Sequence, residues 1–354
     1  MVGRRELDED DVRVRPGRGK SRPRSKERPT HDDAGQGFVT AVDRGRFTLV
    51  LGSPDDPGHE IYAVKARDIG RKGVVVGDQV AVVGDLSGRP DTLARIVRVE
   101  PRSTTLRRSA DDSDPVERVI VANADQLVIV TSVTNPEPRP RLIDRCLVAA
   151  YDAGLTPLLV LTKADLKTPD ELLGLYGDLD VPYVVTSRHD NLDLGELGDH
   201  LEDRISVMIG HSGVGKSTLV NALVPQAQRA TGRVNNVTGR GRHTSTSAVA
   251  LPLPIGGWVI DTPGVRSFGL AHVDPARVIH AFEDLESGTD ECPRACSHDE
   301  PDCGLDTWAM GTANPPATVA RIMSLRRLLR SRGDDQDSTA STEADSAYTA
   351  DTSD

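Results

Sequence analysis

A glycine-rich run that ends in a lysine and a serine is the segment of this chain best suited to chemistry. It reads GHSGVGKS, the pattern of phosphate-binding P-loops. The glycines let backbone N–H groups turn toward phosphates, Lys216 reaches the β and γ phosphates, and Ser217 can ligate Mg²⁺. The residues expected to contact nucleotide here are Gly210, His211, Ser212, Gly213, Val214, Gly215, Lys216, Ser217 and Thr218. The run predicts binding and hydrolysis of a nucleoside triphosphate.

A second motif follows an apolar segment further along the chain. Asp261 ends the run WVI and precedes Thr262, Pro263 and Gly264, which places its carboxylate at the carboxyl edge of a sheet, where it can hold Mg²⁺ through water. The backbone amide of Gly264 is expected to contact the γ-phosphate. Loss of that contact on hydrolysis would release the segment that follows.

A third motif indicates which base is bound. Thr162, Lys163, Ala164 and Asp165 follow the apolar strand PLLVL and resemble the guanine-recognition motif of GTPases. A buried Asp165 carboxylate would accept from the ring N–H and amino group of guanine, two donors that adenine does not present, and would lose its partners with the wrong base. Lys163 would lay its methylene stem along the base. Ser187, at the end of PYVVTS, matches the segment whose backbone touches the guanine oxygen.

The segment between these motifs supplies candidates for the switch. Thr244, within GRGRHTSTS, is expected to coordinate Mg²⁺ when the γ-phosphate is present. Two interpretations stay open for His243: contact with the attacking water or γ-phosphate, or an ordinary exposed loop histidine. Val265 stands where many GTPases place a water-orienting glutamine, so intrinsic hydrolysis is expected to be slow and partner-stimulated. The catalytic candidates are therefore Lys216, His243 and Thr244.

The order of the motifs is itself informative. In ordinary GTPases the P-loop precedes guanine recognition, whereas here Thr162–Asp165 and Ser187 come before Gly210, Thr244 and Asp261. The order predicts a circularly permuted GTPase domain. The switch after Gly264 would then lead directly into the C-terminal domain, which nucleotide state could move as a lever.

A cysteine and histidine cluster marks that C-terminal domain. Cys292, Cys296, His298 and Cys303 read C-x₃-C-x-H-x₄-C, three thiolates and one imidazole suited to one closed, tetrahedral, structural Zn²⁺ site. Such clustering in a chain with no apparent signal peptide favours a metal over disulfides. Cys146 lies among apolar residues of a helical pattern and is expected to belong to the core.

The elements that must position these residues show three different patterns of predicted secondary structure along the chain. Short β-rich runs over residues 36–103 predict a five-stranded, OB-like β-barrel. Strands alternating with helices over residues 104–271 predict a parallel α/β sheet with helices on both faces. Residues 272–333 predict a helical, zinc-binding domain with one helix through His280 and Leu285 and an amphipathic helix over 317–329. The fold class is thus multidomain.

The barrel pattern also bears on how nucleic acid would be bound. Only Phe38, Phe47 and Tyr62 are available there as aromatic side chains for base stacking. We therefore expect contact through backbone and shape.

Charge is distributed unevenly. The formal net charge is −11, but the segment from Arg13 to Arg28 holds eight bases and one acid, whereas Asp334–Asp354 holds seven acids and no base. Residues 1–35 are read as a disordered basic arm, either merely solvated or contacting RNA phosphates, and residues 334–354 as a disordered acidic tail. The sequence contains no run apolar enough to span a bilayer, so we expect a cytoplasmic protein with no membrane partner.

The motifs together resemble the ribosome small subunit-dependent GTPase A family. The matching segments are ANADQLVIV, LIDRCLVAA, LTKADL, GHSGVGKSTLVNAL, GRGRHTSTS, IDTPGVRSFGL and SHDEPDC. Thr162 replaces the usual asparagine of the guanine motif, where a hydroxyl could replace part of the amide's role, and the cysteine spacings are shorter than the commonest pattern. The resemblance covers roughly residues 37–332.

That resemblance implies late maturation of the small ribosomal subunit. The barrel and zinc domain would grip ribosomal RNA, and GTP hydrolysis, stimulated by the subunit, would trigger release of GDP-bound protein, expected to be a monomer. Two alternatives stay open: a nucleotide-regulated RNA-binding module with incidental hydrolysis, and a P-loop kinase. A kinase would need an acceptor site, for which no sequence signal is found, and should accept ATP, contrary to Asp165.

Overall fold

The computed structural model describes most of the chain. The described residues are 31–69, 73–89, 91–108, 118–187, 194–225, 248–262, 270, 273 and 275–331. Most of the basic arm, the acidic tail, His243, Thr244, Gly264 and Val265 lie outside these residues. From Ala34 on, the described residues belong to one structural unit.

Five strands form the N-terminal barrel that the sequence predicts. They are β1 (Gly35–Asp43), β2 (Arg46–Gly52), β3 (Pro57–Lys65), β4 (Gln79–Gly84) and β5 (Ala94–Val99), with the 3₁₀ turn η2 (Arg67–Ile69) after β3. Their order is β1-β2-β3-β5-β4, and β4 pairs back onto β1 to close the barrel. Alternate side chains such as Val39, Leu49 and Ile61 fill its interior.

A turn before β4 interrupts the valine-rich run VVVGDQVAVVG of residues 74–84. Gly77 has φ +90°, and a Cβ there would lie 1.9 Å from the carbonyl oxygen of Ala122. Only glycine can bring the backbone this close, so the chain bends at this position and β4 begins at Gln79.

A two-stranded hairpin follows the barrel and was not expected from the sequence. β6 (Thr105–Arg108) pairs antiparallel with β7 (Arg118–Ala122), and Val121 of β7 also forms a bridge with Val76 before β4. The hairpin thereby joins the barrel to the next strand of the chain. Its strands are short and mixed in polarity, which gives them a weak period-2 signal.

The central sheet has the mainly parallel topology that the alternation predicts. Its strands are β8 (Gln126–Ser132), β9 (Thr156–Thr162), β10 (Tyr183–Val185), β11 (Ile205–Gly210), β12 (Val249–Pro252) and β13 (Trp258–Asp261). The order is β10-β9-β8-β11-β13-β12, and all neighbours are parallel except β12, which is antiparallel to β13. β12 also pairs with β1 at Ala41 and Val249, so the sheet continues into the barrel.

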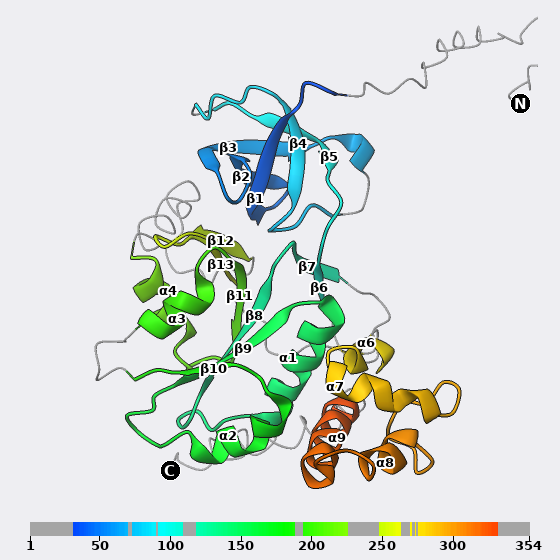
Figure 1. The fold of residues 1–354 in the computed structure, drawn as a ribbon. Helices are drawn as coiled ribbons and strands as arrows, with labels where there is room; N and C mark the ends of the chain where they lie inside the picture. The colour runs from blue at the N-terminus through cyan, green and yellow to red at the C-terminus, as the bar shows by residue number, and fades with distance from the viewer. Residues whose placement is uncertain are drawn as a thin grey trace, which may run out of the picture. The chain divides into compact units, whose positions relative to one another are not determined.

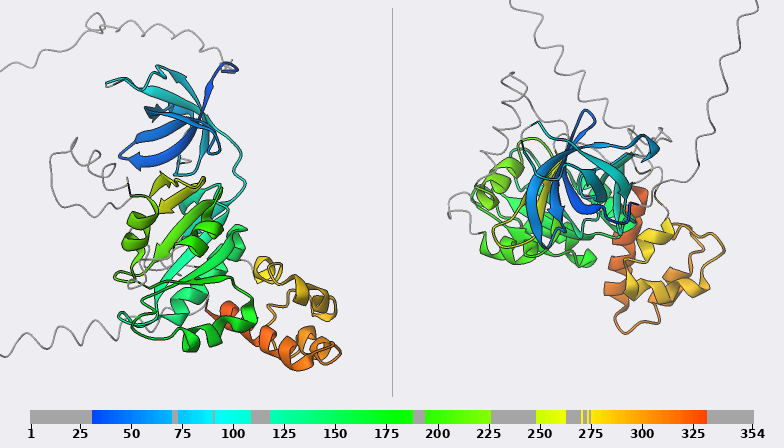
Figure 2. Two further views of the ribbon diagram at one scale, coloured as in Figure 1. Left: turned by 60° about the vertical axis from the view of Figure 1, so that its left-hand side comes forward. Right: turned by 90° about the horizontal axis from the view of Figure 1, so that it is seen from above.

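Helices cover both faces of this sheet, as expected. They are α1 (Pro140–Ala153), α2 (Asp170–Tyr176) with the 3₁₀ turn η3 (Gly177–Leu179), α3 (Gly195–Leu201) and α4 (Lys216–Leu223). α1 and α2 pack in one apolar cluster with Leu127 and Ile129 of β8, and α3 and α4 pack in another with the alternate residues Val128 and Val130. Figures 1 and 2 show α1 on one side of the sheet and α3 with α4 on the other.

The C-terminal part is helical, but its first helix differs from the prediction. The elements are α6 (Pro275–Ile279), α7 (Glu283–Glu286), the 3₁₀ turn η4 (Ser287–Glu291), α8 (Gly304–Ala309) and α9 (Pro315–Arg330). The single helix expected through His280 and Leu285 is wrong, because the chain turns between α6 and α7. Phe282 at that turn has φ −115° and ψ 65° and is 1% exposed. The turn allows the Phe282 ring to be buried, and the chain therefore forms two short helices instead of one.

α9 is held against α1 and η3 by arginines. Arg327 pairs with Asp144 of α1 at 3.3 Å between Nε and Oδ2, Arg321 donates to the carbonyl oxygen of Asp178, and Arg145 of α1 donates to that of Ser331. Asp144 is buried, and desolvation raises the pKa of its carboxyl despite the opposing charge of Arg327. The ion pair therefore compensates a carboxylate that has little access to water.

Replacing Arg327→Ala is expected to lower the free energy of unfolding by about 2 to 3 kcal/mol. The Asp144 carboxylate would be left buried without its counter-charge, and the estimate lies below that for a fully buried pair because the Arg327 side chain is 35% exposed. Urea denaturation measures the change. Arg330→Ala, on the same helix but 67% exposed in its pair with Asp299, is the control and should cost less than about 1 kcal/mol. Equal effects of both variants would contradict the assignment.

Candidate nucleotide site and metal centre

The strand order creates a switch point beside β8. The chain passes from β8 outward to β9 and β10, then returns to β11 on the other side of β8. Loops leaving neighbouring strands in opposite directions open a crevice at their carboxyl ends, where ligands of such sheets bind. The P-loop leaves β11 and the guanine motif leaves β9, so both predicted motifs lie at this edge.

The P-loop has the backbone conformation that its glycines predict. Gly213 and Gly215 have φ +84° and +100°, which other residues rarely adopt. A Cβ at Gly210 would lie 2.6 Å from the carbonyl oxygen of Val130. α4 begins at Lys216 directly after the loop, and Ser217 and Thr218 are exposed at its first turn. The loop thus presents a helix N-terminus suited to phosphate.

The lysine of the P-loop reaches the second predicted motif. The Lys216 ammonium contacts a carboxylate oxygen of Asp261, at the end of β13, and lies 3.4 Å from the carbonyl oxygen of Thr262. The Thr262 hydroxyl donates to the carbonyl oxygen of Met208 in β11 at 2.8 Å. Asp261 is therefore brought to the P-loop, as a Mg²⁺ ligand of a bound nucleotide would need to be.

The guanine motif contacts the P-loop directly. The Thr162 hydroxyl lies 2.5 Å from the carbonyl oxygen of Val214, and Lys163 donates to the carbonyl oxygens of Gly213, at 2.9 Å, and Asn135. The sequence does not reveal the part played by Asn135. The run NPEPRP after β8 could have drawn attention to it, because it follows a strand at the ligand-binding edge.

Asp165 departs from one expectation. The residue is exposed, whereas discrimination between bases is expected from a carboxylate that is buried. Asp165 follows the end of β9 by three residues and lies in a turn, beyond the layer that the helices cover. A base bound against Asp165 would itself have to shield the carboxylate from water.

Ser187 lies beside the same motif. The backbone N–H of Ala164 donates to the carbonyl oxygen of Thr186 at 3.3 Å, and the N–H of Thr186 donates to that of Leu161 at 2.7 Å. These bonds hold the segment after β10 next to the segment after β9. The structure thus brings Ser187 and the guanine motif together.

A pocket adjoins the P-loop on the α1 face of the sheet. Its lining includes Ile129, Ile143, Cys146, His211 and Val214. The lining contains neither the guanine motif nor Lys216 or Asp261, so this pocket shares only P-loop residues, among them Gly210, His211 and Val214, with the predicted nucleotide contacts. Cys146 is buried in it among apolar neighbours, and burial raises the pKa of its thiol, as expected for a core cysteine.

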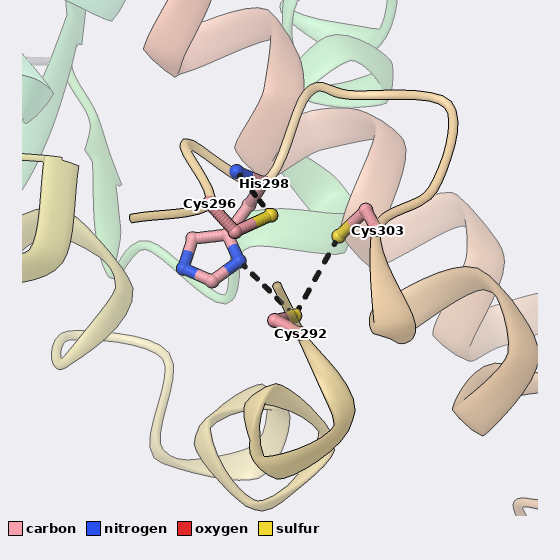
Figure 3. A group of neighbouring side chains, drawn as sticks. All are labelled: Cys292, Cys296, His298 and Cys303. Atoms are coloured by element: carbon pink, nitrogen blue, oxygen red, sulfur yellow. Dashed lines mark hydrogen bonds between the residues drawn. The ribbon is translucent and has the colours of Figure 1, made fainter. Parts of the chain in front are cut away.

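The four predicted zinc ligands meet in space. Their ligand atoms all lie within 4.8 Å of one another, and Figure 3 shows the four side chains gathered around one point. The Cys292 sulfur is 3.7 Å from Nδ1 of His298 and 3.9 Å from the Cys303 sulfur. A tetrahedral Zn²⁺ with Zn–S bonds near 2.3 Å places sulfurs about 3.8 Å apart. The donor set and its spacing therefore fit zinc.

The surroundings of the cluster fix its backbone. Arg326 of α9 donates to the carbonyl oxygen of His298 at 2.8 Å and forms two bonds with the carboxylate of Asp306. Glu300 accepts from the backbone N–H and the hydroxyl of Ser297. These groups act on the ligand-bearing loop and were missed by the sequence analysis. The role of Arg326 carries no local signal, because its partners His298 and Asp306 are distant in the chain.

His243, Thr244 and Gly264 lie outside the described residues, so their predicted roles stay predictions. Within the described part of the chain, no helix combines the length and apolarity needed to cross a membrane.

Known proteins resemble this chain in sequence and in fold. The profile of the RsgA GTPase family matches residues 99–271. A protein of Pseudomonas syringae pv. tomato named small ribosomal subunit biogenesis GTPase RsgA is 39% identical over 264 residues, which cover 70% of this chain and 75% of that protein. One of the same name from Chlorobaculum parvum is 37% identical over 279 residues, covering 76% and 90%.

Two solved structures share the fold. YjeQ from Thermotoga maritima is 27% identical with a TM-score of 0.58, covering 85% of this chain and 99% of that one. YloQ, described as a circularly permuted GTPase, is 22% identical with a TM-score of 0.59, covering 87% and 99%, and supports the fold alone. The P-loop of β11 follows the guanine motif of β9 in the chain, as in a permuted GTPase. The sequence matches to the Pseudomonas and Chlorobaculum relatives show that the protein belongs to the RsgA GTPase family.

Proposed function

We propose that this GTPase acts in late maturation of the small ribosomal subunit. Barrel and zinc domain would bind ribosomal RNA, and GTP hydrolysis stimulated by the subunit would release the protein. The observation that carries the proposal is the close sequence match to relatives named small ribosomal subunit biogenesis GTPase RsgA, which extends over most of the chain. The permuted GTPase domain, flanked by a barrel and a cysteine cluster, supports it.

In the proposed site, the phosphates lie on the P-loop and Lys216 moves from Asp261 to the β and γ phosphates. A bound Mg²⁺ would neutralise developing charge on the phosphoryl oxygens. Its ligands would be Ser217 at the start of α4, Asp261 through water, and Thr244. The base would lie between the guanine motif and Ser187, with Asp165 accepting from its ring N–H and amino group.

The barrel is suited to RNA through its backbone and its charges. Phe47 is buried inside it and Phe38 is buried against Trp258 of β13, whereas Tyr62 is 44% exposed, so base stacking has one aromatic side chain available among the described barrel residues. Exposed bases are present on it, among them Arg44, Arg46, Lys65, Arg67, Arg89 and Arg95, beside exposed acids, among them Asp43, Asp55, Asp56, Glu60, Asp85 and Asp91. The scarcity of exposed aromatic side chains disfavours stacking, so we expect contact of the bases and the backbone with phosphates.

Zinc in the C-terminal cluster would hold the helical domain together. The four ligands leave no open position, which indicates a structural ion. Desolvation raises the pKa of the Cys292 and Cys296 thiols, so a bound cation would supply the charge that stabilises the thiolates. We further propose a cytoplasmic, monomeric protein.

The second candidate function is an RNA-binding module with incidental hydrolysis, and GTP turnover distinguishes the two. If the subunit stimulates the GTPase, turnover by the full-length protein should rise at least about tenfold when purified small subunits are added, because the activator supplies what the slow intrinsic site lacks. Release of phosphate from GTP measures it, with large subunits as the control partner and Lys216→Ala as the inactive control. A flat response to small subunits would favour the binding module.

Guanine recognition predicts a change of base preference in Asp165→Asn. The side-chain NH₂ of the new asparagine would face the amino group of guanine, so two donors would meet. Xanthine has an oxygen at that position, which can accept from the NH₂. Affinity for GDP is expected to fall by about 100-fold or more, with xanthosine diphosphate binding better than GDP. Calorimetric titration measures both, and Asp178→Asn, exposed on η3, is the matched control. Unchanged GDP affinity would refute the assignment.

The zinc site predicts that Cys296→Ala loses stoichiometric zinc and binding to the small subunit while GDP affinity stays within about twofold, since the cluster is separate from the P-loop. Elemental analysis and subunit co-sedimentation are the measurements. Cys146→Ala removes a thiol of the core instead and should retain zinc. Full zinc content in Cys296→Ala would count against the cluster.

A further inference from the structure

Thr162, the last residue of β9, makes the contact between the guanine motif and the P-loop. The side chain is 5% exposed. Its hydroxyl oxygen is 2.5 Å from the carbonyl oxygen of Val214 and 3.3 Å from that of Thr131. Both partners are backbone carbonyls, which only accept hydrogen bonds.

The number of protons on this side chain limits what else it can bind. A hydroxyl has one O–H donor, and the shorter contact shows that this donor is directed at Val214. The N7 atom of a purine is also an acceptor, so it needs a donor as well. A hydroxyl already bonded to Val214 has no proton left for N7.

An asparagine at this position would not have that limitation. Its amide carries two N–H donors, one for the Val214 carbonyl and one for N7. Thr162 keeps the first function and lacks the second. The threonine is therefore not equivalent to an asparagine, because it can support the P-loop but cannot also donate to the base.

The neighbouring residue strengthens the same contact. Lys163, with φ +62°, donates to the carbonyl oxygen of Gly213 at 2.9 Å. Two consecutive P-loop carbonyls, those of Gly213 and Val214, are thus held by two consecutive residues of the guanine motif. The conformation of the phosphate-binding loop and the position of the base site are mechanically joined at this point.

We propose that Thr162 is a positioning and specificity-determining residue. Its hydroxyl fixes the P-loop against the guanine motif and leaves N7 of the base without a side-chain donor from position 162. Base selection rests on the N1 and amino edge that faces Asp165. The inference rests on the proposed guanine site and adds that this site does not distinguish guanine from 7-deazaguanine.

The experiment compares GDP with 7-deaza-GDP, in which a C–H replaces N7. Competition against a fluorescent GDP analogue gives both affinities for the full-length protein. The wild type is expected to bind the two within about twofold of each other. Thr162→Asn adds a donor for N7, so 7-deaza-GDP should bind it about five- to tenfold more weakly than GDP, the size of one net hydrogen bond. A purely structural role of Thr162 would not change this ratio.

Two further variants test the support of the P-loop. Thr162→Val keeps the shape and removes the hydroxyl, so GDP and 7-deaza-GDP should both weaken by about five- to tenfold with their ratio unchanged. Thr162→Ser keeps the hydroxyl and should stay within about twofold of wild type. Thr40→Val removes a buried hydroxyl of the barrel that donates to the carbonyl oxygen of Thr48 and serves as the matched control. If Thr162→Val does not fold, the Ser and Asn variants carry the test.

The outcomes separate this inference from the proposed function. Wild-type protein that binds ADP as well as GDP would refute the guanine site itself. Wild-type protein that prefers GDP over ADP but loses five-fold or more with 7-deaza-GDP would refute only the N7 inference. An unchanged ratio in Thr162→Asn would refute it as well, and wild-type affinity in Thr162→Val would refute the support of the P-loop.

Discussion

The parallel pairing of β11 with β8 is the constraint on which the rest of the site depends. It places Gly210 beside Val130 and so brings the P-loop to the edge where β9 delivers the guanine motif. The same pairing opens the switch point. Segments separated by 52 residues, Thr162 and Val214, then share a hydrogen bond. A nucleotide bound here would contact both sides of one preformed edge.

The permuted order of the motifs is compatible with this arrangement and leaves the geometry of the site unchanged. Sheet geometry depends on which strands are neighbours, and a different order of connection leaves the neighbours unchanged. What changes is where the chain continues after β13. It runs toward α6 and finally α9, which Arg327 and Arg145 attach to α1. The lever predicted for the C-terminal domain would therefore act against helix α1, whose inner face packs on β8 and β9.

Much of this fold and site could be predicted because the responsible signals are local. Glycine positions, the alternation of strands and helices, and four candidate metal ligands within a dozen residues each reflect neighbours in the chain. The break between α6 and α7 could not be predicted, because it depends on burial of Phe282 against distant partners such as Tyr151. The hairpin β6–β7 was missed for a similar reason: Val121 is held by Val76, far away in sequence.

By itself, the sequence determined which side chains are available for chemistry: a P-loop, a carboxylate predicted to bind guanine, and a cysteine and histidine set predicted to bind zinc. These depend on residue type and short spacing. The tertiary structure alone decided how the parts act on one another, including the hydroxyl of Thr162 on the P-loop, the exposure of Asp165 and the hold of Arg326 on the loop of His298. Such contacts join residues whose separation in the chain leaves no periodic pattern, so only packing of the elements reveals them.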